Sequence, residues 1–227
     1  MNTADYACGA KASLVNSSAD PDDRCWAAQW LRRLAWSGLA VVVAEGVNGV
    51  MVGRGADSIA VIAWVLGGAA EAFGSLVILW RFTGSRRLSR SAEARAQQRL
   101  ALSFWLAAGC LVAESTHHLL VRFEPHPAEN AMVVTGVALI QMPFFGWGQR
   151  RLGEMLGSSA ARSKGAQSYL CAAQAAAVFV AVVASFSWPG GWWLGPAIGV
   201  GVASAGFWLG ARAWRDRITP QNGDAGR

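Results

Sequence analysis

Charged residues are scarce in this 227-residue chain. They make up 15% of the sequence, whereas hydrophobic residues make up 53%. Ordinary soluble domains are roughly 25% charged, and a disordered chain combines few hydrophobic residues with a high net charge. Because the sequence also contains apolar runs of about twenty residues, its composition excludes disorder and nearly every soluble globular fold, and it favours a polytopic membrane protein.

The short motifs of common enzyme classes are also missing. The chain has no Gly-x-Ser-x-Gly nucleophile elbow, no His-Glu-x-x-His zinc motif and no Walker A loop. The segment Gly199-Val200-Gly201 lacks the third glycine of a dinucleotide fingerprint and lies in an apolar run. We therefore expect no enzymatic activity and no required cofactor, and we expect any transport to use an ion gradient rather than ATP.

Cysteine is rare, which excludes a disulfide-rich scaffold. The four cysteines are Cys8, Cys25, Cys110 and Cys171, and Cys8 and Cys25 match no zinc-ligand spacing. We expect all four to be free thiols, because a buried cysteine usually behaves as a small hydrophobic residue.

Six apolar segments are each long enough to cross a bilayer, for which about 20 helical residues suffice. They are residues 34–52, 58–80, 100–121, 131–147, 168–188 and 192–213. The fifth is also compatible with a start near Ser159, with Lys164 snorkelling toward the interface. The predicted fold is all-α, a polytopic six-helix transmembrane bundle over residues 31–215. We predict a disordered cytoplasmic tail at residues 1–30 and a short cytoplasmic tail at 216–227.

Lys and Arg are distributed unevenly between the two sides of the predicted bundle. Arg54 and Arg122 lie on one side, and the other 18 of the 20 basic residues lie on the opposite side. Because cytoplasmic loops are enriched in Lys and Arg, both termini are predicted to be cytoplasmic. This topology also explains the net charge of +6, so we infer no nucleic-acid partner. The basic loop at residues 85–99 is predicted either as an amphipathic helix on the membrane surface or as a solvated loop.

Three carboxylates lie inside predicted spans. Glu45 is near the middle of the first span, Glu71 is just inward of the middle of the second, and Glu114 is in the outer half of the third. Ionisable groups at membrane depth cost roughly +2.5 to +3.5 kcal/mol on insertion scales and are functional candidates by default. A rise of about 1.5 Å per residue places Glu45 and Glu71 at similar depth, where they are able to face one another or share a cation.

Two short patterns contain further potential metal ligands. Glu114 precedes His117 and His118 by three and four residues, which places carboxylate and imidazole groups on neighbouring positions of a helix and predicts an outer metal site. A merely polar helix end is the alternative. Gln167 and Cys171 share a helix face at a spacing of four, and they predict either half of a metal site or interhelical hydrogen bonding by Gln167.

Several of these segments resemble one known family. Residues 58–61 with Glu71 and residues 75–81, and the run Ala166-Gln167-Ser168-Tyr169-Leu170-Cys171-Ala172, resemble the second and fifth helices of the cation diffusion facilitator transmembrane domain. The similarity covers roughly residues 34–217 and is greatest to a short bacterial branch of cation transporters. It implies proton-coupled export of a zinc-like divalent cation across the bacterial plasma membrane. It also implies a metal site at Glu71, Gln167 and Cys171, with Glu45 in support.

The sequence departs from the family at three positions that are usually acidic. Gly67, Lys164 and Gly195 stand there instead. The implied site therefore has few of the Cys, His and carboxylate ligands that Zn²⁺ favours. An alternative reading is therefore a non-transporting membrane scaffold or partner subunit that keeps the same fold. The expected partners are the lipid bilayer, a divalent cation and a proton, and a homodimer is left open.

Overall fold

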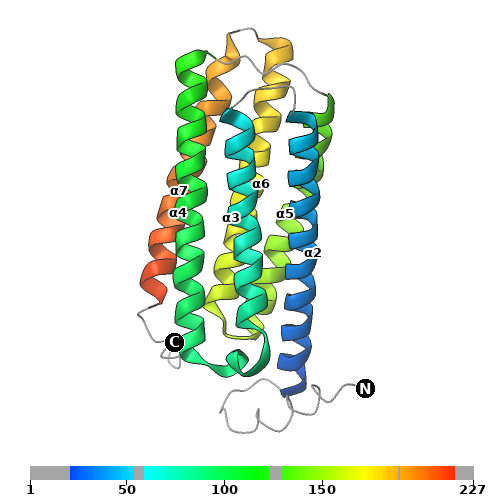
Figure 1. The fold of residues 1–227 in the computed structure, drawn as a ribbon, viewed down its shortest axis with the longest axis vertical. Helices are drawn as coiled ribbons and strands as arrows, with labels where there is room; N and C mark the ends of the chain where they lie inside the picture. The colour runs from blue at the N-terminus through cyan, green and yellow to red at the C-terminus, as the bar shows by residue number, and fades with distance from the viewer. Residues whose placement is uncertain (1–20, 54–58, 123–128, 189, 218–227) are drawn as a thin grey trace, which may run out of the picture.

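The computed structural model describes residues 21–53, 59–122, 129–188 and 190–217, and in these ranges the protein is all-α. Six long helices form an upright bundle (Figure 1). They are α2 (Pro21–Gly53), α3 (Ile59–Arg81), α4 (Arg90–Val121), α5 (Glu129–Met155), α6 (Ser159–Ser187) and α7 (Leu194–Asp216). Two short 3₁₀ helices, η1 (Gly84–Leu88) and η2 (Gly191–Trp193), lie in the connections before α4 and α7.

The six helices form a closed ring of neighbours. Around the ring, α2 packs on α3, α3 on α4, α4 on α7, α7 on α6, α6 on α5, and α5 returns to α2. In addition, α6 contacts both α3 and α4 across the interior. The start of α2 and the end of α7 lie at the same end of the bundle (Figure 1). Side chains on the facing surfaces of α3 and α6 therefore lie in the interior of the bundle.

Each predicted segment overlaps one long helix, and the prediction of an all-α fold is confirmed. At the end of the bundle where α2 begins, the helices extend beyond the predicted segments. Because α2 starts at Pro21, residues 21–30 are helical and do not belong to a disordered tail, whereas residues 1–20 lie outside the described residues. Residues 90–99 form the first turns of α4, so residues 82–89, which include η1, connect α3 to α4.

A tight connection joins α5 to α6. Gly157 has φ +61°, a left-handed conformation that glycine adopts without steric cost. The Gly157 and Ser158 amides donate to the carbonyl oxygens of Glu154 and Gly153 at 3.1 and 2.8 Å, the pattern of a Schellman C-cap. Ser158 then caps α6, because its hydroxyl oxygen accepts from the Ala161 amide at 3.2 Å. The early start of α6 near Ser159 is thereby confirmed.

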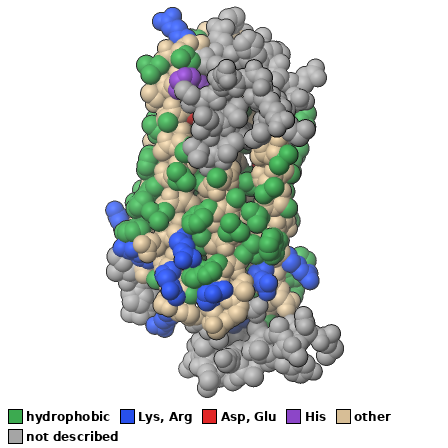
Figure 2. Space-filling view, viewed as in Figure 1, with side chains coloured by type: hydrophobic (Ala, Val, Ile, Leu, Met, Phe, Trp, Pro, Cys, Tyr) green, Lys and Arg blue, Asp and Glu red, His purple; other side chains and the backbone are tan. Residues whose placement is uncertain are grey.

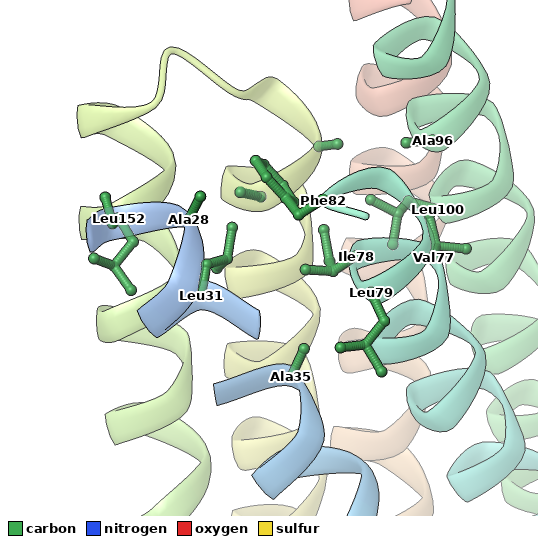
Figure 3. Packing of buried hydrophobic residues seen from close by; sticks show 13 residues of the cluster. Ala28, Leu31, Ala35, Val77, Ile78, Leu79, Phe82, Ala96, Leu100 and Leu152 are labelled. Carbon is green, nitrogen blue, oxygen red and sulfur yellow. The ribbon is translucent and has the colours of Figure 1, made fainter. Parts of the chain in front are cut away.

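Glu93 of α4 links three elements at this end of the bundle. Its Oε2 accepts from Arg81 Nε of α3 at 2.6 Å. Its Oε1 accepts from the Ser158 hydroxyl and the Ala160 amide, each at 2.8 Å. A carboxylate at the N-terminus of α6 is also favourable to the helix dipole. Next to this group, apolar side chains of α2, α3, α4 and α5 pack together, among them Leu31, Ile78, Leu100 and Leu152 (Figure 3).

Small residues bring α4 and α7 close together. A Cβ on Gly199 would lie 2.4 Å from the Ser115 hydroxyl oxygen, and one on Gly206 would lie 3.1 Å from the Ala108 Cβ. A Cβ on Gly210 would lie 2.5 Å from the Trp105 ring. Small residues on one helix face allow this close approach, which supplies packing contact where lipid offers no hydrophobic drive between helices.

The exterior of the bundle is rich in exposed apolar side chains. Trp36, Leu120, Ile140 and Trp208 are each more than half exposed. Figure 2 shows hydrophobic side chains over the middle of one face and Lys and Arg side chains gathered near its lower end. Two described segments, α4 and Gly191–Asp216, are long and apolar enough to cross a membrane. These features favour a membrane location.

The expectation of four free thiols is wrong for Cys25, which is disulfide-bonded. Cys110 and Cys171 are free, as expected, and Cys8 lies outside the described residues.

Candidate functional site

One face of α6 carries a stripe of polar side chains into the centre of the bundle. Lys164, Gln167, Ser168 and Cys171 follow one another at spacings of three, one and three residues, which places them on a single side of a helix with 3.6 residues per turn. Lys164 and Ser168 have no exposed surface, and Gln167 is also buried. The stripe faces α3, where it meets the carboxylate of Glu71.

Glu71 is a buried carboxylate, only 5% exposed, and three side chains of α6 converge on it. Lys164 Nζ forms an ion pair with Oε1. Ser168 Oγ lies 3.3 Å from the same oxygen, and Cys171 Sγ donates to Oε2 at 3.4 Å. The carboxylate is therefore compensated from within the protein by one ammonium group and by two weaker donors.

The prediction that Lys164 snorkels to the membrane interface is wrong. Its side chain is fully buried because it runs along the α3–α6 interface toward Glu71. Gly74 leaves room for this path, since a Cβ there would lie 3.0 Å from Lys164 Cδ and 2.2 Å from Gln167 Oε1. An ammonium group in this position is tolerated because its charge is paired with a carboxylate and hydrogen-bonded.

Gln167 joins α6 to two neighbouring helices. Its Nε2 donates to the carbonyl oxygen of Ala70 in α3 at 3.1 Å and lies 3.4 Å from Ser103 Oγ in α4. Of the two roles predicted for Gln167, this is the interhelical hydrogen bonding. Its Oε1 is buried next to Gly74 and has no hydrogen-bond partner, so this carbonyl oxygen is unpaired.

Glu45 approaches the site from α2. Its Oε1 accepts a hydrogen bond of 2.8 Å from Gln141 Nε2 of α5. Glu45 therefore links α2 to α5. The sequence-based expectation that Glu45 and Glu71 face one another or share a cation stays a prediction.

α5 completes the polar cluster. Gln149 is buried, and its Oε1 lies 3.3 Å from Ser168 Oγ. The single hydroxyl hydrogen of Ser168 serves either Gln149 or Glu71 at one time. The central site, defined as Glu71, Gln149, Lys164, Gln167, Ser168 and Cys171, therefore draws side chains from α3, α5 and α6.

The outer group of predicted ligands lies farther along α4. Glu114 lies eleven residues after Ser103, the α4 residue that contacts Gln167. This separation is a rise of about 16 Å along the helix. The His117 and His118 rings lie 6.0 Å apart, centroid to centroid, and His117 Nδ1 is buried without a hydrogen-bond partner. Across the described residues, no three or more His, Cys, Asp and Glu side chains form a group that would hold a metal ion. Both predicted metal sites stay predictions.

The three positions that depart from the family pattern differ in their surroundings. A Cβ on Gly67 would meet no heavy atom within 4 Å, whereas one on Gly195 would lie 2.7 Å from the Ala181 Cβ. Gly195 thus permits close packing of α7 on α6, and a side chain there would force these helices apart. Lys164 occupies the third position with a charge opposite to the expected one.

Sequence reasoning identified Glu71 and Cys171 but missed what surrounds them. Ser168, Gln149 and Gly74 were not predicted as site residues, and Lys164 was assigned to the interface. The spacing of Lys164, Ser168 and Cys171 on one helix face was visible in the sequence. That spacing is typical of a stripe on one face of a helix that begins near Ser159, and it does not show by itself whether the stripe is buried.

No family model matches the chain, and no curated protein matches it.

Proposed function

We propose that the protein is a membrane transporter of divalent, zinc-like cations, with Glu71 as the central binding carboxylate. The observation that supports this function best is the buried Glu71 carboxylate at the α3–α6 interface, in contact with a thiol and an ammonium group. Ionisable side chains inside a transmembrane bundle typically mark ion pathways. Carboxylate and thiolate groups are also ligands that Zn²⁺ prefers.

The remaining predicted ligands are arranged to assist. Cys171 already contacts Glu71, and Gln167 offers an unpaired carbonyl oxygen. Glu45, the supporting ligand of the proposal, is hydrogen-bonded to Gln141 of α5. Binding of a divalent ion requires deprotonated carboxylate and thiol groups, so ion uptake releases protons. This ligand chemistry supports the proposed proton-coupled export, which is what the sequence resemblance to the cation diffusion facilitator transmembrane domain implies.

The same proposal includes six membrane crossings in the bacterial plasma membrane, with both termini in the cytoplasm. All six long helices have 23 to 33 residues, enough to cross a hydrocarbon core about 30 Å thick. The basic residues between the predicted spans support this orientation. Residues 85–89, 150–151 and 212–217 would then lie on the cytoplasmic side.

Transport into proteoliposomes tests the proposed function. Uptake of Zn²⁺, Mn²⁺, Co²⁺ and Fe²⁺ would be followed for the wild type and for Glu71→Ala, with protein-free vesicles as the blank. We expect uptake of at least one of these ions by the wild type and none above blank by Glu71→Ala. Equal uptake by the two proteins would remove Glu71 from the transport site.

A second candidate function is a non-transporting membrane scaffold or partner subunit. The observation that favours it is the Lys164–Glu71 ion pair, because it neutralises the central carboxylate without any guest. Purified protein that binds no divalent ion above background, yet forms a defined complex with another membrane protein or with a second copy of itself, would support this candidate over transport.

A further inference from the structure

The central site contains a cation that belongs to the protein. Lys164 is fully buried, and its Nζ contacts Glu71 Oε1 and, at 3.3 Å, Ser168 Oγ. An ammonium group is a compact positive charge with three donors. It therefore satisfies the Glu71 carboxylate much as a bound metal ion would, and it does so from the end of a flexible side chain.

Three side chains of α6 contact the Glu71 carboxylate. Lys164 and Ser168 contact Oε1, and Cys171 contacts Oε2. A guest cation approaching Glu71 consequently meets an ammonium group already in place, and both positive charges cannot share the carboxylate at close range without strong repulsion. Entry of a guest requires the Lys164 side chain to leave.

Gly74 and Ser168 hold the Lys164 side chain in place for its contact with Glu71. Gly74 leaves the α3 surface open along the lysine stem, since a Cβ at that position would lie 3.0 Å from Lys164 Cδ. Ser168, one helical turn farther along α6, lies 3.3 Å from both Lys164 Nζ and Glu71 Oε1. The ammonium group is thus held at the carboxylate from two sides.

From these contacts we infer that Lys164 is a tethered cation that occupies the cargo position of Glu71 in the empty transporter and competes with the guest ion. The inference rests on the proposed function for the identity of the cargo. Lys164 sets the affinity and selectivity of the site, because a guest binds only if it compensates Glu71 better than the ammonium group does. It also spares the empty site an unpaired carboxylate, which is costly inside a membrane protein.

Equilibrium binding of Zn²⁺ to the purified full-length protein in detergent tests this inference. The proteins compared are the wild type, Lys164→Met, and the double variant Lys164→Met with Glu71→Gln. Met keeps the length of the side chain and removes its charge. We expect Lys164→Met to bind Zn²⁺ at least about tenfold more tightly than the wild type, and we expect the double variant to lose this gain. Lys164→Gln serves in the same comparison if the Met variant does not fold.

The possible outcomes separate this inference from the proposed function. Equal Zn²⁺ affinity of the folded wild type and of the folded Lys164 variant would overturn the tethered-cation role, even if the wild type transports Zn²⁺. Tighter binding by the variant, with no binding and no transport by the wild type, would support the role of Lys164 and reject transport as the function. Absence of binding by every folded variant would overturn both.

Discussion

Lys164 and Glu71 are each removed from water, and each relies on the other for compensation. Removing one partner of a buried ion pair leaves an isolated charge, which typically costs 3–5 kcal/mol, whereas removing both is much less harmful. The pair is therefore an energetic unit, and its two members have to be altered together as well as singly to show how each contributes.

A double-mutant cycle follows from this coupling. We expect Glu71→Gln and Lys164→Met each to lower the free energy of unfolding by about 3 kcal/mol. We expect the combined variant to lose clearly less than the sum, because no unpaired charge remains. Reversible unfolding in detergent micelles or bicelles measures all four proteins, and purely additive losses would show that the two side chains do not interact.

At the scale of the helix pair, Gly146 and Gly165 allow α5 and α6 to cross closely. A Cβ on Gly165 would lie 2.7 Å from the Gly146 carbonyl oxygen and 3.0 Å from the Arg150 amide nitrogen. Both of these atoms belong to the backbone and cannot rotate away. A methyl group at Gly165 therefore has to separate the two helices, and such overpacking typically costs 1–3 kcal/mol.

The variant Gly165→Ala should accordingly lower the free energy of unfolding by about 2 kcal/mol. Gly201→Ala in α7 is the matched control, since a Cβ there meets no heavy atom within 4 Å and the residue is exposed. Thermal unfolding followed by circular dichroism compares the two. A loss of equal size in both variants would assign the effect to the general replacement of glycine rather than to the α5–α6 crossing.

The sequence predicted helical elements better than it predicted their ends. Apolar runs identified the position of each long helix, because the runs are what the bundle buries or exposes to lipid. Helices α2, α4 and α6 continue into polar sequence at the end near Glu93. There the stabilising contacts are hydrogen bonds between distant segments, such as Glu93 with Ser158, and hydropathy alone cannot reveal such contacts.

The central site was only partly predictable for a related reason. Glu71 and Cys171 stood out as polar groups in apolar segments, and the structure brings them into contact. The role of Lys164 depends on how α6 is rotated relative to α3, which its local sequence does not determine. A lysine near the end of an apolar segment is usually a snorkelling residue, and here a facing carboxylate changes that outcome.

For the whole molecule, the proposed six-span topology makes a prediction about access from the two sides of the membrane. Cysteines introduced one at a time at Arg122 and Gly190, in a background without the native cysteines, should react with a membrane-impermeant maleimide in intact cells. Cysteines at Ser85 and Arg217 should react only after permeabilisation, because the proposed topology places the basic side in the cytoplasm. Labelling of all four positions in intact cells, or the reverse pattern, would contradict the proposed orientation.

The central claim is that cation movement through this bundle depends on the buried carboxylate of Glu71. The most direct measurement is the initial rate of Zn²⁺ uptake into proteoliposomes by the wild type, Glu71→Gln and Glu154→Gln, normalised to folded protein. Glu154 is an exposed carboxylate near the end of α5 and serves as the control. We predict uptake by the wild type and by Glu154→Gln, and none above protein-free vesicles by Glu71→Gln. Uptake by Glu71→Gln at the wild-type rate, or no uptake by the folded wild type, would contradict the claim that cation movement depends on Glu71.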